Sequence, residues 1–214
     1  MGWFGRKADW PQLPADEIRK RSKLLVIDDQ QFDYVSLFEK DGYNIEKWDD
    51  IVDLPKLESG YYDVILLDIQ GVGKQQSSNE QGFGILKHLK KVRPPQIIIA
   101  YSNADYAVKY QDFFSMADAA FSKASDYVDF KRKVDELLIS RFSMGFYVDK
   151  IIALASPHTS DMGKIRKLSR KAIAQRNANI VKPYLEGVID DKELITTILR
   201  IIGCAIELGK VIWP

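Results

Sequence analysis

The chain has 214 residues, of which 46% are hydrophobic and 29% are charged, a profile typical of a globular protein. Its net charge of +1 gives no argument for a nucleic-acid or membrane partner of the chain as a whole. The single cysteine, Cys204, excludes an intrachain disulfide. Because we find no apolar run long enough for a signal peptide or a membrane span, we expect a cytoplasmic protein.

The first part of the chain, residues 1–21, is predicted to be an irregular arm that ends in a short helix from Asp16, its cap, to Arg21. From residue 22, short apolar runs alternate with segments of helical spacing. The runs predict strands over residues 23–29, 43–48, 62–68, 96–102 and 117–123, and the spacing predicts helices over residues 31–39, 52–57, 83–92, 105–114 and 126–142. This alternation predicts an α/β domain over residues 22–144, with a doubly wound, five-stranded parallel sheet.

Strand signals end near Gly145, and residues 145–214 are predicted to form a small all-helical domain. Its helices are expected over residues 146–155, 161–177, 180–188 and 192–212. The boundary is soft, because Leu138, Phe142 and Phe146 keep a spacing of four residues. The last helix of the α/β domain could therefore run directly into the C-terminal part.

Charged and hydroxyl side chains stand at the ends of four predicted strands: Asp28 and Asp29, Asp68, Ser102 and Lys123. In parallel sheets the carboxyl ends of the strands share one edge, so three carboxylates are expected to converge there. They repel each other unless a cation lies among them, and oxygen ligands in this number suit Mg²⁺. A lysine and a hydroxyl donor beside them would offset the charge of a phosphoryl group transferred to Asp68.

These strand ends resemble the motifs of bacterial response-regulator receiver domains. The matching segments are residues 26–29, 64–68, 98–102 and 121–123, in the family's order, and the similarity covers residues 22–143. The resemblance implies a flavodoxin-like receiver fold with Asp68 as the phosphoacceptor.

The resemblance also implies the roles of the neighbouring residues. Mg²⁺ would be held by Asp28 (through water), Asp29, Asp68 and the backbone carbonyl of Gln70. Lys123 and Ser102 would contact the phosphoryl oxygens. The phosphodonor implied is a histidine kinase or phosphotransfer protein, or a small molecule such as acetyl phosphate.

The sequence departs from the family pattern around the site. The loop over residues 71–82 is longer than usual, so we expect it to overhang the site and to gate donors. Asn103 stands where a small residue is usual, and Ala124 replaces the proline that usually follows the lysine. Ala120 replaces the aromatic residue that moves on activation, so Tyr101 or Phe121 would have to substitute for it. The switch mechanism is therefore expected to differ from that of the family.

The segment from Gly71 to Lys74 follows a predicted strand, as a phosphate-binding loop does. That motif needs a glycine six residues before the lysine and a serine or threonine after it, and these positions hold Asp68 and Gln75. We therefore interpret the segment as an ordinary loop.

Two helices of the C-terminal part stand out. One is basic, in a region (residues 146–214) with eleven basic and seven acidic residues, and it carries Lys164, Arg166, Lys167, Arg170, Lys171 and Arg176. A basic helix can bind the phosphates of nucleic acid or lipid, although such a face is more often simply solvated. The last helix has aliphatic residues on nearly all sides between residues 194 and 211, which predicts burial, for example in a homodimer core.

We therefore expect a phosphorylation-switched signalling protein, not an enzyme, whose C-terminal helices mediate an interaction or dimerisation. The alternative is a DNA-binding regulator that uses the basic helix, although we find no convincing helix–turn–helix pattern. A third interpretation is a receiver-like scaffold that never accepts phosphate.

Overall fold

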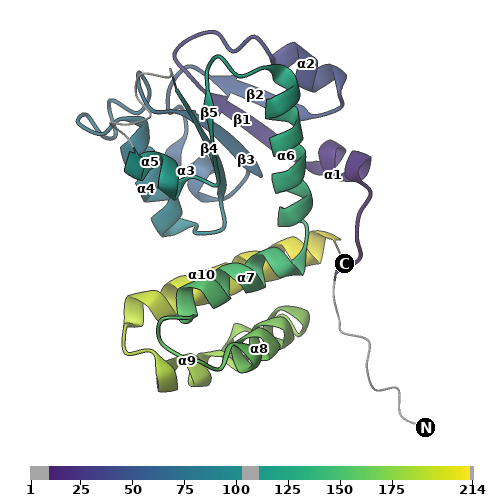
Figure 1. Cartoon of the computed structure of the whole chain (residues 1–214), viewed down its shortest axis with the longest axis vertical. Helices are drawn as coiled ribbons and strands as arrows, with labels where there is room; N and C mark the ends of the chain where they lie inside the picture. Colours follow the sequence, from purple (N-terminus) through teal and green to yellow (C-terminus); the bar gives the residue numbers. More distant parts are fainter. Residues whose placement is uncertain (1–9, 103–110, 213–214) are drawn as a thin grey trace. The chain divides into compact units, whose positions relative to one another are not determined.

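The computed structural model describes residues 10–102 and 111–212 (Figure 1). Within these ranges the chain divides into two compact units. Residues 14–139 form the first, which we call the sheet unit. Residues 140–212, together with residues 10–13, form the second, the helical unit.

The sheet unit is built on five parallel strands, which confirms the predicted fold class. They are β1 (Lys23–Ile27), β2 (Asn44–Trp48), β3 (Val64–Asp68), β4 (Ile97–Ser102) and β5 (Ala119–Ser122). Their order in the sheet is β2-β1-β3-β4-β5. The chain first adds a strand on one side of β1 and then moves to the other side, so the order switches between β1 and β3. This is the doubly wound order in which ligands bind at the strand ends beside the switch.

Helices cover both faces of the sheet, with α4 and α5 on one side and α6 on the other (Figure 1). The helices are α1 (Ala15–Arg21), α2 (Val35–Lys40), α3 (Leu54–Glu58), α4 (Gly82–Val92), α5 (Gln111–Met116) and α6 (Tyr127–Arg141). The predicted cap of α1 was wrong, because Pro14 occupies that position and Asp16 lies in the first turn. The first half of the helix predicted over residues 105–114 lies outside the described residues.

The strands are buried on both faces, as their uninterrupted apolar runs predicted. On one face, Ile27, Leu67 and Ala100 belong to a cluster that also contains Leu86 and Leu89 of α4. The alternate strand residues point to the opposite face and are fully buried as well: Leu24, Val26, Leu66 and Ile99. Helix α6 adds Phe130, Val134 and Leu138 at helical spacing, all of them buried. This double covering holds the strand ends in fixed positions.

The helical unit contains no strand among its described residues, as predicted. Its elements are α7 (Met144–Ala155), α8 (Met162–Ala174), a short 3₁₀ turn (Ala178–Ile180), α9 (Lys182–Val188) and α10 (Lys192–Ile212). Helix α6 ends at Arg141 and does not continue into the C-terminal part, an option that the sequence had left open. The Ser143 hydroxyl accepts a hydrogen bond from the backbone N–H of Phe146 (3.2 Å), so a new helix starts there.

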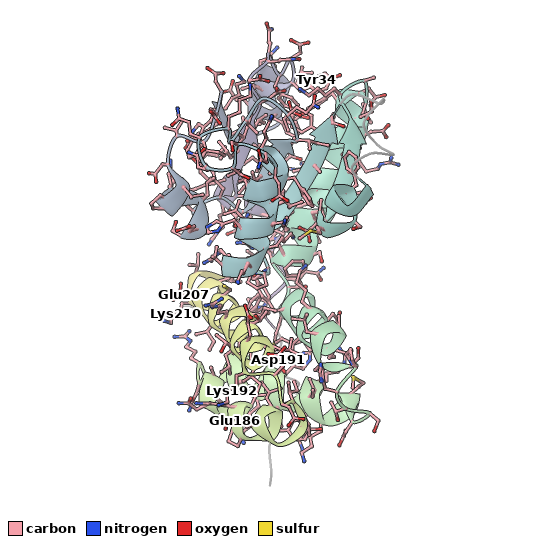
Figure 2. The ribbon with its side chains drawn as sticks, turned by 90° about the vertical axis from the view of Figure 1, so that its left-hand side faces the viewer. Tyr34, Glu186, Asp191, Lys192, Glu207 and Lys210 are labelled. Carbon is pink, nitrogen blue, oxygen red and sulfur yellow. The ribbon has the colours of Figure 1, made fainter. Side chains whose placement is uncertain are left out.

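Helix α10 packs against α7, α8 and α9 of its own chain. Its inner face is buried through Ile195, Ile198, Ile201 and Ile202, whereas Val211 is 61% exposed. Glu207 and Lys210 lie at its outer edge in Figure 2 and are exposed. The prediction that this helix is apolar on nearly all sides was therefore wrong, and its own unit covers the four buried isoleucines. No described helix is both long enough and apolar enough to cross a membrane.

Candidate functional site

The sheet register brings one row of side chains together beside the switch point. Asp68 pairs with Tyr101 of β4, and Tyr101 pairs with Phe121 of β5. Since Ile27 pairs with Leu67, Asp28 continues the same row one residue beyond β1. Side chains at paired positions of neighbouring strands point to the same face. Asp28, Asp68 and Tyr101 therefore lie next to each other although they are far apart in the sequence.

Three carboxylates converge at this edge, as predicted. One oxygen from each of Asp28, Asp29 and Asp68 lies within 4.8 Å of the others. Asp28 and Asp68 are only 2% and 3% exposed, whereas Asp29 faces solvent. Buried carboxylates this close need a positive charge between them, and an all-oxygen set with one solvent-facing member fits a cation that keeps several waters. These three residues fit Mg²⁺.

Lys123 supplies one positive charge. Its ammonium donates hydrogen bonds to Asp68 Oδ2 (2.7 Å) and Asp28 Oδ1 (3.1 Å). Burial raises the pKa of the Asp68 carboxyl, and the opposing effect of Lys123 only partly offsets this. Burial lowers the pKa of Lys123, but its bonds to Asp68 and Asp28 outweigh this and the net shift is upward. The lysine therefore stays charged between two carboxylates.

Two further donors hold Asp28. The backbone N–H of Gln30 donates to Oδ1 (2.9 Å), and the hydroxyl of Tyr101 donates to Oδ2 (2.7 Å). Burial, followed by the negative charge of Asp28, raises the pKa of Tyr101 well above its usual value, so the hydroxyl remains a donor. The sequence singled out Tyr101 only as a substitute for a missing aromatic residue. Its bond to Asp28 follows from the register.

Ser102 and Gln70, the other two predicted site residues, lie at the same edge. Ser102 ends β4, is 4% exposed, and its carbonyl accepts a hydrogen bond from the backbone N–H of Lys123 (2.8 Å). The backbone N–H of Gln70 donates to Asp68 Oδ1 (3.2 Å). These contacts place both residues beside the carboxylates, while their roles toward a phosphoryl group and a metal remain predictions.

The loop over residues 71–82 is folded against the site. Gly71 has a positive φ of 84°, and a Cβ there would lie 2.1 Å from Asp29 Oδ2, so only glycine fits. Val72 is fully buried, and the Gln81 side chain accepts a hydrogen bond from the Gly71 N–H (2.9 Å). Helix α4 starts at Gly82, well after Lys74, which agrees with rejecting a phosphate-binding loop. A gating role for the loop remains a prediction.

The departures from the family pattern have structural counterparts. Phe121 stacks on Phe130 of α6, with ring centroids 4.6 Å apart, and Tyr101 contacts the same ring at 6.3 Å. Both candidate aromatic substitutes therefore pack inward against α6. No cis peptide bond occurs in the described ranges, which include Ala124. Asn103 lies outside them.

No protein-family model matches the sequence, and no curated protein matches it. Solved structures do match. A response-regulator receiver domain protein from Methanospirillum hungatei is 23% identical, with the match covering 56% of this chain and 95% of that chain at a TM-score of 0.42. The receiver domain of NtrX from Brucella abortus is 17% identical over 54% of this chain and 97% of that chain, at 0.43.

A third match is the response regulator TrrA from Thermotoga maritima, solved in complex with Mg²⁺ and BeF. It is 25% identical, over 54% of this chain and 98% of that chain, at a TM-score of 0.45. These neighbours are response-regulator receiver domains. The matches cover a little more than half of this chain, and the rest is helical. The predicted fold is confirmed by the strand order β2-β1-β3-β4-β5, which is the flavodoxin-like order.

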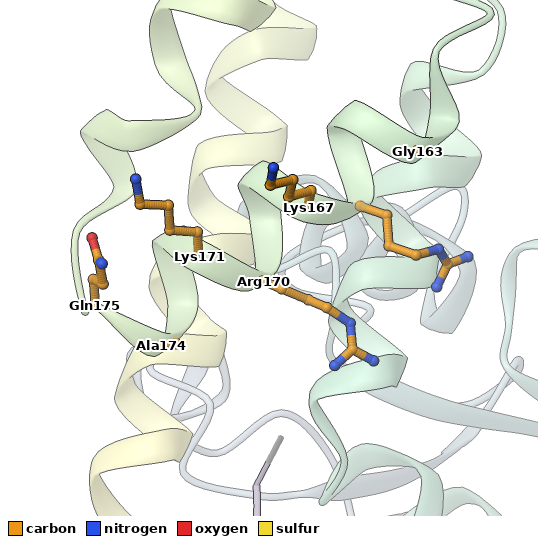
Figure 3. A pocket seen from close by; sticks show the side chains of 7 residues that line it. Gly163, Lys167, Arg170, Lys171, Ala174 and Gln175 are labelled. Carbon is orange, nitrogen blue, oxygen red and sulfur yellow. The ribbon is translucent and has the colours of Figure 1, made fainter. Parts of the chain in front are cut away.

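A second candidate surface lies on α8 in the helical unit. A groove of about 610 Å³ is lined by Gly163, Arg166, Lys167, Arg170, Lys171, Ala174 and Gln175. Figure 3 shows Lys167, Arg170 and Lys171 projecting from the helix around it. None of these described lining residues is acidic, and Lys167 and Lys171 are exposed. The predicted basic helix therefore presents its charge to solvent.

Proposed function

We propose that the chain is a two-component response regulator that accepts a phosphoryl group on Asp68 in a Mg²⁺-dependent reaction. The observation that carries this proposal is the position of Lys123, which bridges Asp68 and Asp28, two of the three converging carboxylates. A purely structural ion pair needs one carboxylate for one lysine. A third carboxylate at the same place costs free energy unless a cation offsets it.

Each residue of the site has a separate role in the proposed phosphoryl transfer. An oxygen of Asp68 forms a bond to phosphorus while the bond from phosphorus to the donor breaks, and the leaving group departs with the electron pair. Lys123 moves its hydrogen bond from Asp68 to a phosphoryl oxygen, and Ser102 donates to another. Mg²⁺ would be held by Asp29, Asp68, the Gln70 carbonyl and, through water, Asp28, and it would supply positive charge to the phosphoryl group. The proposed donor is a histidine kinase or a phosphotransfer protein.

The proposal is tested by incubating the chain with Mg²⁺ and acetyl phosphate. One acid-labile phosphate is expected per wild-type chain, and none on the Asp68→Asn or Asp68→Ala chain. Asp49→Asn is the matched control, because Asp49 directly follows β2 as Asp28 follows β1, but its side chain is 86% exposed. This control should label fully. Full labelling of Asp68→Ala would refute the assignment.

The metal site has its own test. Asp29→Asn should weaken Mg²⁺ binding more than Asp28→Asn, because Asp29 faces solvent while three donors already occupy Asp28. Calorimetric titration of each chain measures both affinities. Unchanged affinity in both variants would rule out this arrangement of ligands.

For the output, we propose that the helical unit contacts another protein chain. The sequence predicted self-association because α10 carries many aliphatic residues. In the structure, however, the four buried isoleucines of α10 are covered by its own unit. Sedimentation of the full chain, with and without beryllofluoride, separates a homodimer from a monomer. A dimer that forms only with beryllofluoride would make self-association the switched output.

The basic face of α8 supports one alternative, a DNA-binding regulator. Binding through phosphates would fall steeply with salt concentration. The variant with Arg166, Lys167, Arg170 and Lys171 changed to Ala should then lose duplex binding. A control with the same charge change in the same unit replaces Lys150, Lys182, Lys192 and Lys210 by Ala. Binding that is absent in the wild type, or lost equally in both variants, would reject this alternative.

A further inference from the structure

Tyr101 is an unusual residue for its position. It lies in β4, whose six residues are all buried, and it is only 1% exposed. A tyrosine hydroxyl in such a place must find a partner, because an unpaired buried hydroxyl costs free energy. Here the partner is a carboxylate of the candidate metal site, Asp28, at 2.7 Å.

The ring of Tyr101 is held from two sides. Phe32 contacts it edge-on at a centroid distance of 5.9 Å, and Phe130 of α6 contacts it at 6.3 Å, nearly perpendicular. Aromatic contacts of this kind favour a defined ring orientation. The hydroxyl therefore has little freedom to move away from Asp28.

The hydrogen bonds of Asp28 show what this contact does. Oδ1 accepts from both Lys123 and the Gln30 N–H, which uses its two lone pairs. Oδ2 accepts from Tyr101. Besides Lys123, the Tyr101 hydroxyl and the Gln30 backbone N–H hold Asp28 through hydrogen bonds.

We propose that Tyr101 is a positioning residue for the metal site, which holds the Asp28 carboxylate in place beside Asp29 and Asp68. The inference rests on the proposed function only in taking the three carboxylates as a Mg²⁺ site. It adds a residue that acts through Asp28 and touches neither metal nor phosphoryl group. Partners of metal ligands are commonly needed for full metal affinity.

The test is a thermodynamic cycle on the full chain, with Mg²⁺ alone as the ligand and calorimetry as the measurement. Tyr101→Phe keeps the ring and removes the hydroxyl, and it should weaken Mg²⁺ binding about tenfold, the lower end for such partners. In an Asp28→Ala background the same change should have no further effect, because its target is gone.

Tyr43→Phe is the matched control. Tyr43 is also buried, and its hydroxyl also donates to a carboxylate, that of Asp135 at 2.5 Å, but Asp135 is not among the three converging carboxylates. This variant should bind Mg²⁺ as the wild type does. An equal loss in Tyr43→Phe would show that any lost hydroxyl weakens the site, and would overturn the proposal.

Three other results would overturn it as well. They are unchanged Mg²⁺ affinity in Tyr101→Phe, an equal loss in the Asp28→Ala background, and a Tyr101→Phe chain that is unfolded without Mg²⁺, since a positioning residue leaves the fold intact. A failure of the proposed function can be distinguished from a failure of the Tyr101 proposal. In that case wild-type chain binds Mg²⁺ with the expected dependence on Tyr101, yet acetyl phosphate does not label Asp68.

Discussion

The acidic edge of the sheet unit and the basic face of α8 both carry many charged residues, but the charges are buried at the edge and exposed on α8. At the sheet edge, Asp28 and Asp68 are buried and share Lys123, 16% exposed, as a common partner. On α8, Lys167 and Lys171 are exposed and line an open groove. Buried charges must be paired by fixed neighbours, whereas exposed charges are stabilised by water.

The difference indicates what each surface is suited for. A buried set of charges costs desolvation energy in every folded molecule, and such sets are often found where chemistry takes place. Exposed cations cost almost nothing to fold and serve contacts that respond to salt. The acidic edge is thus the better candidate for chemistry, and α8 for reversible electrostatic contact.

The largest expected effect comes from removing the shared partner at the acidic edge. Lys123→Met should destabilise the fold by about 3–5 kcal/mol, because it leaves two buried carboxylates without their counter-charge. Lys171→Met, on the exposed face, should change stability by less than about 0.5 kcal/mol. Urea unfolding of both chains without Mg²⁺ measures the free energies. Similar values for the two variants would erase the contrast between the surfaces.

The second largest effect is expected in the apolar core of the helical unit, where aliphatic side chains are buried. Ile198 of α10 is fully buried, so Ile198→Ala should lower the free energy of unfolding by about 3 kcal/mol through lost burial and the cavity left behind. Val211→Ala is the control on the same helix, since this side chain is 61% exposed, and it should cost under about 0.5 kcal/mol. If both variants lose little, α10 does not depend on this inner face.

The smallest effect is expected at a charged cluster in the sheet unit whose burial is intermediate between that of the acidic edge and that of the α8 face. Arg19 of α1 donates two hydrogen bonds to Asp135 (2.8 and 2.7 Å), and Tyr43 donates a third. Burial acts to raise the pKa of Asp135, but these bonds and the charge of Arg19 outweigh it and lower the pKa below its usual value. The ionised carboxylate therefore stabilises the folded state.

Because the folded pKa is lowered, this stabilisation is present above the unfolded pKa of about 4 and is lost as the pH falls through the folded value. Asp135→Asn should cost about 1 kcal/mol at pH 7, a modest value because the cluster is partly solvated. The gap to wild type should close below about pH 4. Urea unfolding at pH 7, 5 and 3 measures it, with Asp129→Asn as the control, because the Asp129 side chain is 48% exposed. A gap that stays constant down to pH 3 would contradict the assignment.

The sequence by itself determined the α/β architecture and the acidic site. Buried parallel strands need apolar residues on both faces, so they read as continuous runs, and polar residues can only follow where a run ends. Asp28, Asp68 and Lys123 stand at such ends, which predicted that they would meet at one edge of a parallel sheet. The basic face of α8 could also be predicted, because the helical spacing of its charged residues is visible in the sequence.

Only the tertiary structure decided which side chains meet. The bond from Tyr101 to Asp28 depends on the register of β1, β3 and β4, which no local pattern encodes. The coverage of α10 depends on how α7, α8 and α9 pack, so counting its aliphatic residues overestimated the exposed apolar area. The fold of the loop over residues 71–82 likewise depends on Val72 entering the core. Each of these outcomes rests on contacts between residues distant in the chain, whose energies appear only once the elements have packed.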